Sequence, residues 1–399
     1  MKLLNEILQK IKPKNNSVKK EIDEIISNIN KELKKNKIKA DVIVGGSFAK
    51  NTHLIGDYDC DIFVRFDYKY KDDNISDKLA KVLKQFKANR VHGSRDYFQF
   101  TKSLNYEVVP VLKIVKAKDA VNVTDASPLH VAWVRKQKKN DEIRLAKAFC
   151  KALNIYGAES HIKGFSGHVL DILTAHYGCF LKLLKASQKW KDKQVVDIQK
   201  YHKDALFVLN TSKTSGPLIV VDPIQKDRNA AAALSYESVE TFKQKAKEFL
   251  SKPSAKFFEK KHLTKKDFPG AIIIDIIPLE GKRDVVGAKI LKVHEAILRM
   301  LEKADFEVKD SGWVWDNETF IWFKMKKDNL DYQKVIKGPP INMVDFALNF
   351  KRNHADVFEK KGILYARINR KYVNAVDLIK DALKNEEVKN KVKSAKVER

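Results

Sequence analysis

The amino-acid sequence predicts an α+β fold that is divided into several domains. Its 399 residues are too many for one ordinary domain and suggest about two to four. Short apolar strands mix with amphipathic helices in roughly the first 120 residues, the pattern of a sheet covered by helices. A strand, a long helix and a hairpin return near the C-terminus, after a segment that is mostly helical in pattern.

Apolar spacing and turn residues define the elements of the first domain. Apolar residues recur at helical spacing over 16–36 and predict an amphipathic helix. The apolar run 41–44 predicts a strand that ends in a glycine turn, with Ser47 placed to cap a following helix. The other elements expected here are a strand over 59–66, a helix over 76–87, and strands over about 97–102 and 105–115.

The rest of the chain is predicted to contain a helical segment and a second mixed region. A lysine-rich stretch near 251–269, with a proline toward each end, predicts a linker. The expected elements are helices within 140–210, a strand over 218–221, a helix over 229–250, a strand over 271–277, a helix over 287–304, a hairpin pairing 312–315 with 319–325, and a tail over 384–399 that is frayed or a loose helix. We therefore divide the chain into a head (1–135), a helical neck (136–250), and a C-terminal α+β body with a helical tail (251–399).

Composition narrows the class of protein. Lys and Arg number 78 against 51 Asp and Glu, a net charge of +27 that favours a polyanionic partner, with nucleic acid first. A lysine-rich proteome explains the surplus about equally well. Hydrophobic residues make up 44%, which excludes a disordered basic tail. No apolar stretch approaches the ~18–20 residues of a membrane span, and the N-terminus lacks the apolar region of a secretion signal. Three widely spaced cysteines form no metal-ligand cluster, so we expect a cytoplasmic protein with no membrane partner.

The sharpest local pattern is a glycine-serine turn followed by two aspartates. Asp59 and Asp61 are two apart on an expected strand, so they project from the same face. Two neighbouring carboxylates repel each other unless a positive charge lies between them, and Mg²⁺ prefers one or two carboxylates plus phosphate oxygens. The Gly46-Ser47 turn offers backbone N–H groups and a hydroxyl at a helix start, where phosphate binds well. The pattern therefore indicates in-line nucleotidyl transfer.

A third carboxylate, Glu107, opens the apolar run 108–112 on another expected strand. An acid there is costly to bury unless it is paired or bound to a metal. Taken alone, Glu107 is better explained as a solvated strand end. Beside the aspartate pair, we interpret it as the third metal ligand, because the ordered combination is much more specific than a lone Gly-Ser or Asp-x-Asp.

Longer stretches resemble a known family. The segments 46–52 (GSFAKNT) and 56–61 (GDYDCD) resemble the signature of the polymerase-β-like nucleotidyltransferases, which include poly(A) polymerases, oligoadenylate synthetases and CCA-adding enzymes. Further stretches are similar to the archaeal (class I) CCA-adding enzymes, namely 127–130, 155–159, 164–167, 221–223 with 228–229, 338–340 and 364–367. The resemblance covers nearly the whole chain in order, and it implies that the head is a nucleotidyltransferase domain.

The resemblance also implies a role for each matching residue. Asp59, Asp61 and Glu107 are the expected metal carboxylates, although the family often has Glu first and Asp third. Ser47 and Lys50 are expected to contact the triphosphate. The family's usual Arg is Lys50 here, which keeps the charge and loses the bidentate fork. Phosphate or ribose contacts are implied for Ser127 (where Thr is common), His130, Lys147 and Tyr156, and a nucleotide-selecting pocket for Asp222 and Arg228.

Without the resemblance, several of these residues have a simpler explanation. Tyr156 fits a core aromatic, and His130 fits a buried histidine whose hydrogen bonds are satisfied. Lys147 on a helix face is ordinarily a solvated lysine. Arg228 fits a cap for a helix that the alanine run 230–233 would begin.

The C-terminal part interleaves basic residues with aromatic ones. The aromatics are Trp313, Trp315, Trp322, Phe323, Tyr332, Tyr365 and Tyr372. Basic and aromatic residues together can neutralise phosphates and stack terminal bases. For any one aromatic, a core position is about twice as frequent as a stacking one.

The resemblance implies template-independent addition of C, C and A to the 3′ end of tRNA from CTP and ATP, by two-metal nucleotidyl transfer that releases pyrophosphate. The expected cofactor is Mg²⁺, and the expected partners are CTP, ATP and tRNA, bound through its acceptor arm and 3′ end. Two alternatives stay open: another RNA 3′-nucleotidyltransferase that adds poly(A) or oligo(A), and a non-catalytic RNA-binding protein on the same scaffold. A homodimer also stays open.

Overall fold

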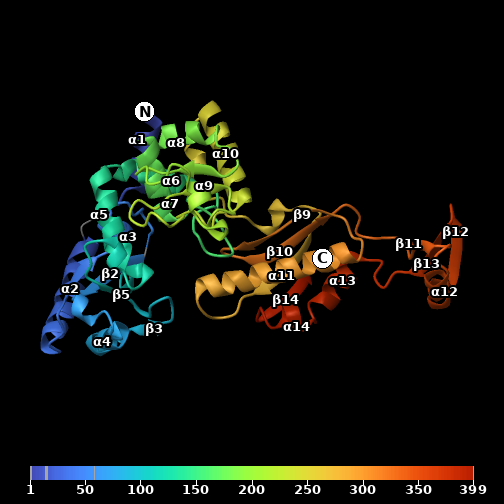
Figure 1. Ribbon diagram of the computed structural model, residues 1–399, viewed down its shortest axis with the longest axis horizontal. Coiled ribbons are helices and arrows are strands. Elements are labelled where there is room, and N and C mark those ends of the chain that lie inside the picture. The colour runs from blue at the N-terminus through green and yellow to red at the C-terminus, as the bar shows by residue number, and fades with distance from the viewer. Residues whose placement is uncertain (1, 14–16, 58, 399) are drawn as a thin grey trace. The chain divides into compact units, whose positions relative to one another are not determined.

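The computed structural model describes residues 2–13, 17–57 and 59–398, so Tyr58 of the expected turn lies outside the described residues. The chain forms two compact units, Met1–Lys261 and His262–Arg399, which follow one another along the colour bar of Figure 1. Helices and several separate sheets occur in both units, which confirms the multi-domain α+β class. In the described part of the chain, no helix is both long and apolar enough to cross a membrane.

The first unit begins with a five-stranded mixed sheet in the order β1-β2-β5-β4-β3. Its strands are β1 (Ala40–Val44), β2 (Asp59–Phe66), β3 (Asn89–Val91), β4 (Tyr97–Thr101) and β5 (Asn105–Leu112). The central strands β2 and β5 run parallel, and the other neighbours are antiparallel. The helices α2 (Ser17–Lys35) and α4 (Ile75–Val82) pack on this sheet through a shared apolar core.

Strand β2 shows why the sheet has one apolar and one polar face. Cys60, Ile62 and Val64 are fully buried in the core below the helices. Because side chains alternate along a strand, Asp59 and Asp61 project from the opposite face. This arrangement confirms the predicted strand and its two faces.

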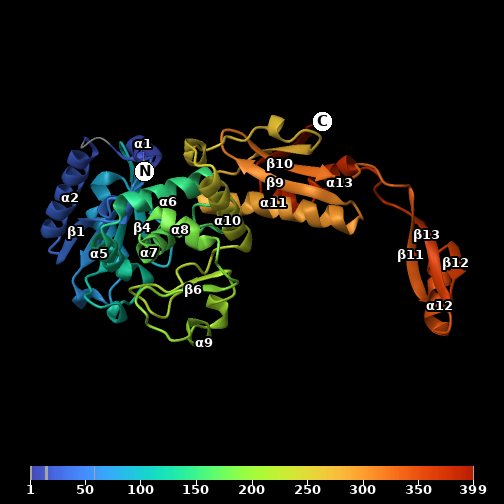
Figure 2. The ribbon, with the colours of Figure 1, turned by 90° about the horizontal axis from the view of Figure 1, so that it is seen from above.

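A helical layer follows the sheet within the same unit (Figure 2). Its main members are α1 (Lys2–Ile11), α5 (Ser127–Gln137), α6 (Asn140–Ala152), α7 (Gly167–Tyr177), α8 (Phe180–Ser187) and α10 (Tyr236–Ser251). Their core is rich in edge-on and tilted phenylalanine rings, including Phe149, Phe165, Phe180, Phe242 and Phe249. The short parallel strands β6 (Gln194–Val196) and β7 (Leu218–Val220) flank an excursion that carries α9 (Ala205–Val208).

The second unit contains two antiparallel sheets. The larger, in the order β14-β8-β10-β9, comprises β8 (Ile272–Ile277), β9 (Val308–Trp315), β10 (Thr319–Met325) and β14 (Ser394–Glu398), and it packs with α11 (Arg283–Lys303), α13 (Ala375–Ala382) and α14 (Glu386–Lys389). The smaller, in the order β11-β13-β12, comprises β11 (Gln333–Pro340), β12 (Asp356–Lys360) and β13 (Ile363–Asn369), and α12 (Val344–Asn353) contacts β11.

Several element predictions are wrong in detail. The helices expected within 140–210 are interrupted after Ser187, where the chain enters β6 and the excursion that carries the short helix α9. The helix expected from 229 begins only at Tyr236, since Ser235 caps it and the alanine run 230–233 lies outside it. The helix expected over 76–87 ends at Val82. The tail is a short helix followed by β14, which pairs with β8 and is therefore not frayed.

Candidate active site

Three carboxylates meet where the parallel strands β2 and β5 begin. The register pairs Asp61 with Glu107 and Asp59 with Asn105. The amide of Asn105 donates to Asp59 Oδ1 at 3.2 Å, and Gln99 Nε2 donates to Glu107 Oε1 at 2.7 Å. Burial raises the pKa of Asp61 to about 6, and the charges of Glu107 and Asp59 add to the rise. The three acids therefore form one mutually repelling cluster.

The glycine turn lies directly against these carboxylates. The Gly45 N–H donates to the backbone oxygen of Asp61 at 2.7 Å. Gly46 has a φ of +51°, and a Cβ there would lie 1.6 Å from Asp61 Oδ2, so only glycine fits. Ser47 follows in the four-residue helix α3 (Gly46–Ala49); Gly45, not Ser47, is its N-cap, because the helix begins at the glycine with positive φ.

Lys50, at the end of this turn, forms a buried ion pair. Its Nζ lies 2.7 Å from Asp171 Oδ2 on α7, and the two side chains are 12% and 0% exposed. Burial by itself would raise the pKa of Asp171, but the charges of Lys50 and Lys147 hold it well below its ordinary value. The carboxylate therefore stays ionised. Asp171 was not predicted, because the contact joins positions 121 residues apart.

Lys147 and Tyr156 lie next to this pair, inside the protein. Lys147 is only 3% exposed, and its Nζ donates to Thr52 Oγ1 at 2.9 Å. Burial lowers its pKa, while the charge of Asp171 opposes that change. A Cβ on Gly167 would lie 2.9 Å from the Tyr156 hydroxyl and 3.7 Å from Lys147 Nζ, so the glycine makes room for both polar groups. The alternative that Lys147 is a solvated lysine is wrong.

Helix α6 holds the segment between the turn and the carboxylates. Four polar side chains on one face of α6 donate hydrogen bonds to successive residues of 50–57. The donors are Asn140, Arg144, Lys147 and Lys151, and their acceptors lie in Lys50, Asn51, Thr52, His53 and Asp57. Helix α6 therefore holds the chain after the glycine turn at residues 50–53 and at Asp57.

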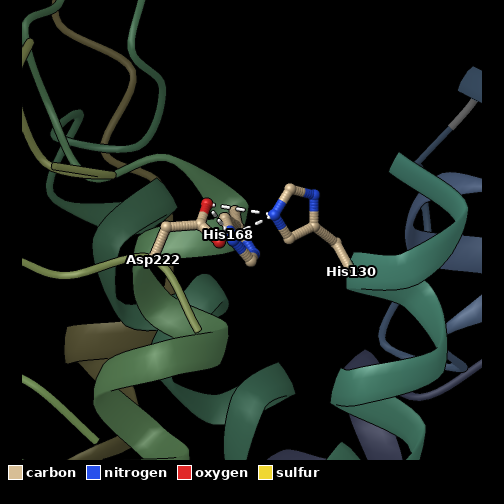
Figure 3. A group of neighbouring side chains, drawn as sticks. All are labelled: His130, His168 and Asp222. Carbon is tan, nitrogen blue, oxygen red and sulfur yellow. Dashed lines mark hydrogen bonds and ion pairs between the residues drawn. The ribbon is translucent and has the colours of Figure 1, made fainter. Parts of the chain in front are cut away.

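A second buried cluster surrounds Asp222, after β7 (Figure 3). His130 Nε2 from α5 lies 2.9 and 3.0 Å from its two oxygens, and His168 Nε2 from α7 lies 3.3 Å from Oδ2. Arg228 Nη1 donates to Oδ2 at 2.9 Å. Three of the predicted pocket residues, His130, Asp222 and Arg228, are thus brought together. His168 was missed, although it directly follows the Gly164–Gly167 stretch.

By residue type, His130, His168 and Asp222 could hold a metal ion, with ligand atoms within 4.8 Å of one another. However, Asp222 already accepts hydrogen bonds from the backbone N–H groups of Ile224 at 2.9 Å and Gln225 at 3.1 Å. The Arg228 cation occupies its other oxygen. We therefore interpret this cluster as a hydrogen-bonded hub, whereas Asp59, Asp61 and Glu107 gather three carboxylates with Lys50 as an opposing charge, a set that suits divalent cations.

His168 lies between the Lys50–Asp171 ion pair and the Asp222 cluster. Its Nδ1 lies 3.9 Å from Asp171 Oδ2, while its Nε2 faces Asp222.

Ser127 opens α5, one turn before His130. Arg228 is 42% exposed and bound to Asp222, so it does not cap a helix.

Three family models match consecutive parts of the chain. They are a nucleotidyltransferase domain over residues 26–130, the second domain of tRNA nucleotidyltransferase over 141–259, and the C-terminal domain of CCA-adding enzyme over 281–397. A CCA-adding enzyme from Nanoarchaeum equitans is 37% identical over 343 residues, which cover 83% of this chain and 84% of the relative. The chain belongs to the CCA-adding enzyme family. A CCA-adding enzyme from Methanocaldococcus jannaschii is 29% identical over 403 residues, covering 95% of this chain and 90% of that one.

Solved structures show the same fold at much lower identity. The Cid1 poly(U) polymerase has a TM-score of 0.52 at 13% identity, covering 65% of this chain and 98% of that chain. A cytoplasmic RNA terminal U-transferase has a TM-score of 0.51 at 14% identity, with coverage of 66% and 98%. The family membership therefore comes from sequence, and these structures confirm a nucleotidyltransferase fold over about two thirds of the chain.

Proposed function

We propose that this chain is a cytoplasmic enzyme that adds C, C and A to the 3′ end of tRNA from CTP and ATP without a template. The observation that carries the proposal is the register of β2 and β5, which sets Asp61 beside Glu107 and against the Gly45–Gly46 turn. Membership of the CCA-adding family supplies the substrate class.

In the proposed reaction, the 3′-hydroxyl of tRNA attacks the α-phosphorus of the nucleotide. A new P–O bond forms, the bond to the β-phosphate breaks, and pyrophosphate leaves with the electron pair while the hydroxyl loses its proton. Two Mg²⁺ ions held by Asp59, Asp61 and Glu107 would lower the pKa of the hydroxyl and offset the charge of the leaving group. These acids fit that role because their cluster has three negative charges with Lys50 as the opposing cation.

The remaining predicted residues have roles that follow from their positions. Ser47 and Lys50 are proposed to bind the triphosphate beside the carboxylates, together with Lys147 and Tyr156. Ser127, His130, Asp222 and Arg228 are proposed to bind ribose or phosphate and to select the base. All of these residues lie in the unit Met1–Lys261.

Each of the three predicted domains has its own proposed role. We propose that residues 1–135 carry the chemistry, 136–250 complete the nucleotide pocket, and 251–399 grip tRNA, whose acceptor arm and 3′ end reach the site. The three family models, which cover 26–130, 141–259 and 281–397, support this division.

Incubating the chain and Mg²⁺ with tRNA that lacks its CCA end, and with each labelled nucleotide, tests the proposal. CTP alone should add two residues, and CTP with ATP should add C, C and A and then stop. Repeated A addition would favour a poly(A)- or oligo(A)-adding enzyme instead. Binding of tRNA without any incorporation would favour the non-catalytic alternative.

A further inference from the structure

Two lysines and one aspartate form a buried charge cluster next to the turn that carries Ser47. Asp171 is completely buried, its Oδ2 lies 2.7 Å from Lys50 Nζ, and Lys50 is only 12% exposed. Lys147, also buried, interacts electrostatically with both groups. Asp171 is thus the carboxylate that pairs directly with Lys50, and Lys147 acts on the same carboxylate.

The contacts of Asp171 suit a temporary partner for Lys50. Among the described residues, its second oxygen, Oδ1, is buried and has no hydrogen-bond partner. His168 Nδ1, which is also buried without a hydrogen bond, lies 3.9 Å from Oδ2. A carboxylate that served only to stabilise the fold would be expected to have both oxygens satisfied. Any phosphate that binds Lys50 has to compete with this carboxylate.

We propose that Asp171 is a positioning residue that holds Lys50 when no nucleotide is bound and limits how tightly the pocket binds triphosphate and pyrophosphate. This inference rests on the proposed function. It concerns the same site but assigns a role to a residue outside the predicted set.

The physical reason is a balance between binding and release. Without a counter-charge, two lysines shielded from water would bind the product pyrophosphate strongly, because opposite charges interact more strongly away from solvent. Tight binding of substrate and product alike does not accelerate turnover. Three additions require pyrophosphate to leave three times, so a carboxylate that takes Lys50 back favours release. It also fixes the Lys50 ammonium in one direction before the next nucleotide binds.

The test compares Asp171→Asn with the intact chain and with a control on the same helix. Asn has the shape of Asp without its charge. The control is Thr174→Val, one turn further along α7, which removes a buried hydroxyl with no hydrogen-bond partner in the described part of the chain and leaves the charges unchanged. Binding of pyrophosphate and of CTP, each with Mg²⁺, is measured by calorimetry, and incorporation is measured separately.

For Asp171→Asn we expect pyrophosphate to bind about tenfold more tightly and kcat for incorporation to fall about tenfold, while KM for CTP decreases. Pyrophosphate should also raise the melting temperature of Asp171→Asn more than that of the intact chain, because it neutralises the uncompensated lysines. The Thr174→Val control should match the intact chain in pyrophosphate affinity, kcat, KM and the rise in melting temperature that pyrophosphate causes. Unchanged or weaker pyrophosphate binding by Asp171→Asn would overturn the proposal, since it would leave Asp171 a purely structural role.

A second variant keeps the test valid if Asp171→Asn does not fold. The double variant Lys50→Gln with Asp171→Asn removes the uncompensated charge, so it should recover stability relative to Asp171→Asn alone. A double variant that is no more stable would overturn the proposal. If the intact chain binds neither CTP nor pyrophosphate, the proposed function itself is contradicted. If the intact chain binds both and Asp171→Asn binds pyrophosphate no more tightly, only the inference about Asp171 fails.

Discussion

The two units of this chain place their charges in different environments. In Met1–Lys261, several charged or titratable side chains are buried, namely Asp125, His130, Arg144, Lys147, Asp171 and Asp222. Over the described residues of the second unit, 262–398, no polar or charged side chain is buried to that degree. Its ion pairs range from partly exposed, as in Arg370–Asp305 at 16% and 47%, to largely exposed, as in Arg299–Glu387 at 61% and 49%.

The difference follows from the free energy of placing a charge inside the protein or at its surface. A charge taken out of water is unfavourable unless it is paired and hydrogen-bonded, so a fold retains buried charges where it uses them. Around the proposed site, the buried charged side chains orient one another, and their electrostatic interactions stay strong because little water screens them. Exposed lysines and arginines cost little and interact weakly with each other, which leaves them available for phosphates of a nucleic acid.

The carboxylate cluster should show the largest effect. Asp61→Ala is expected to reduce nucleotide incorporation by at least about a thousandfold, because it removes the central ligand for divalent ions. Affinity for tRNA, measured by filter binding, should change little. The metal-free chain should become more stable at pH 7 by up to about 2 kcal/mol, since burial and two neighbouring acids raise the pKa of Asp61 to about 6.

The sign of this stability change follows from the raised pKa. A folded carboxylate with a raised pKa resists ionisation, so the cost to the metal-free fold is absent below about pH 4, grows as the pH rises toward 6 and is complete above that value. The stabilisation by Asp61→Ala should therefore shrink as pH falls from 7 to 5. Retained incorporation would contradict the metal assignment, and a stability gain that is independent of pH would contradict the electrostatic origin.

A buried and a surface arginine compare the two units directly. Arg144 is 1% exposed and donates to Asp141, Asn51 and the His53 carbonyl, so Arg144→Met should cost about 3 kcal/mol of unfolding free energy. Arg299→Met should cost less than about 1 kcal/mol, because its partner stays solvated. Denaturant unfolding measures both, and equal losses would contradict the distinction between the units.

The local parts of this site could be predicted, and the contacts between distant segments could not. Asp59 and Asp61 were placed correctly on β2, since alternation along one strand fixes which face a side chain takes. Asp171 and His168 were missed because nothing near them in sequence marks a partner. Their partners, Lys50 and Asp222, are 121 and 54 residues away.

The fold shows the same division. Strands with clear alternation and long amphipathic helices were found within a few residues of their ends, as for α2 and the β9–β10 hairpin. The tail strand β14 was missed, because its charged sequence has little strand character and pairing with β8 alone makes it a strand.

Acid should weaken the buried hub in the first unit by a smaller amount. Burial would raise the pKa of Asp222, but hydrogen bonds from His130 and His168 outweigh it and hold the pKa below its ordinary value. A depressed carboxylate pKa contributes stability above about pH 4 that is lost as pH falls further. Asp222→Asn should therefore destabilise the chain by about 1–2 kcal/mol at pH 6 and by much less at pH 3.

Urea unfolding at both pH values, with Asp204→Asn as a control at an exposed helix cap, tests this prediction. The control removes a carboxylate that lies at the surface, so it reports what the loss of an exposed charge does at the two pH values. A destabilisation by Asp222→Asn that is equally large at pH 3 would show that packing, rather than charge, accounts for the role of Asp222.

The smallest effect is expected at the surface of the second unit. Of the seven aromatics considered for RNA stacking, Phe323 is fully buried and Tyr332 is the exposed one, at 64%. Tyr365 stacks on Phe358 instead. Tyr332→Ala should therefore weaken tRNA binding several-fold, about 1 kcal/mol, with little change in unfolding, because one exposed ring supplies at most one stacking contact.

The matched control is Tyr68→Ala, which removes an exposed tyrosine from the first unit. Filter binding across a salt series separates stacking from charge, since loss of a neutral ring lowers affinity without changing the slope against salt concentration. If Tyr332→Ala binds tRNA as the intact chain does, the second unit holds RNA through its cations alone. If both tyrosine variants lose affinity for tRNA equally, the surface that contacts tRNA is not confined to the second unit. The proposed division between a buried charge cluster in the first unit and an RNA-binding surface in the second would then be wrong.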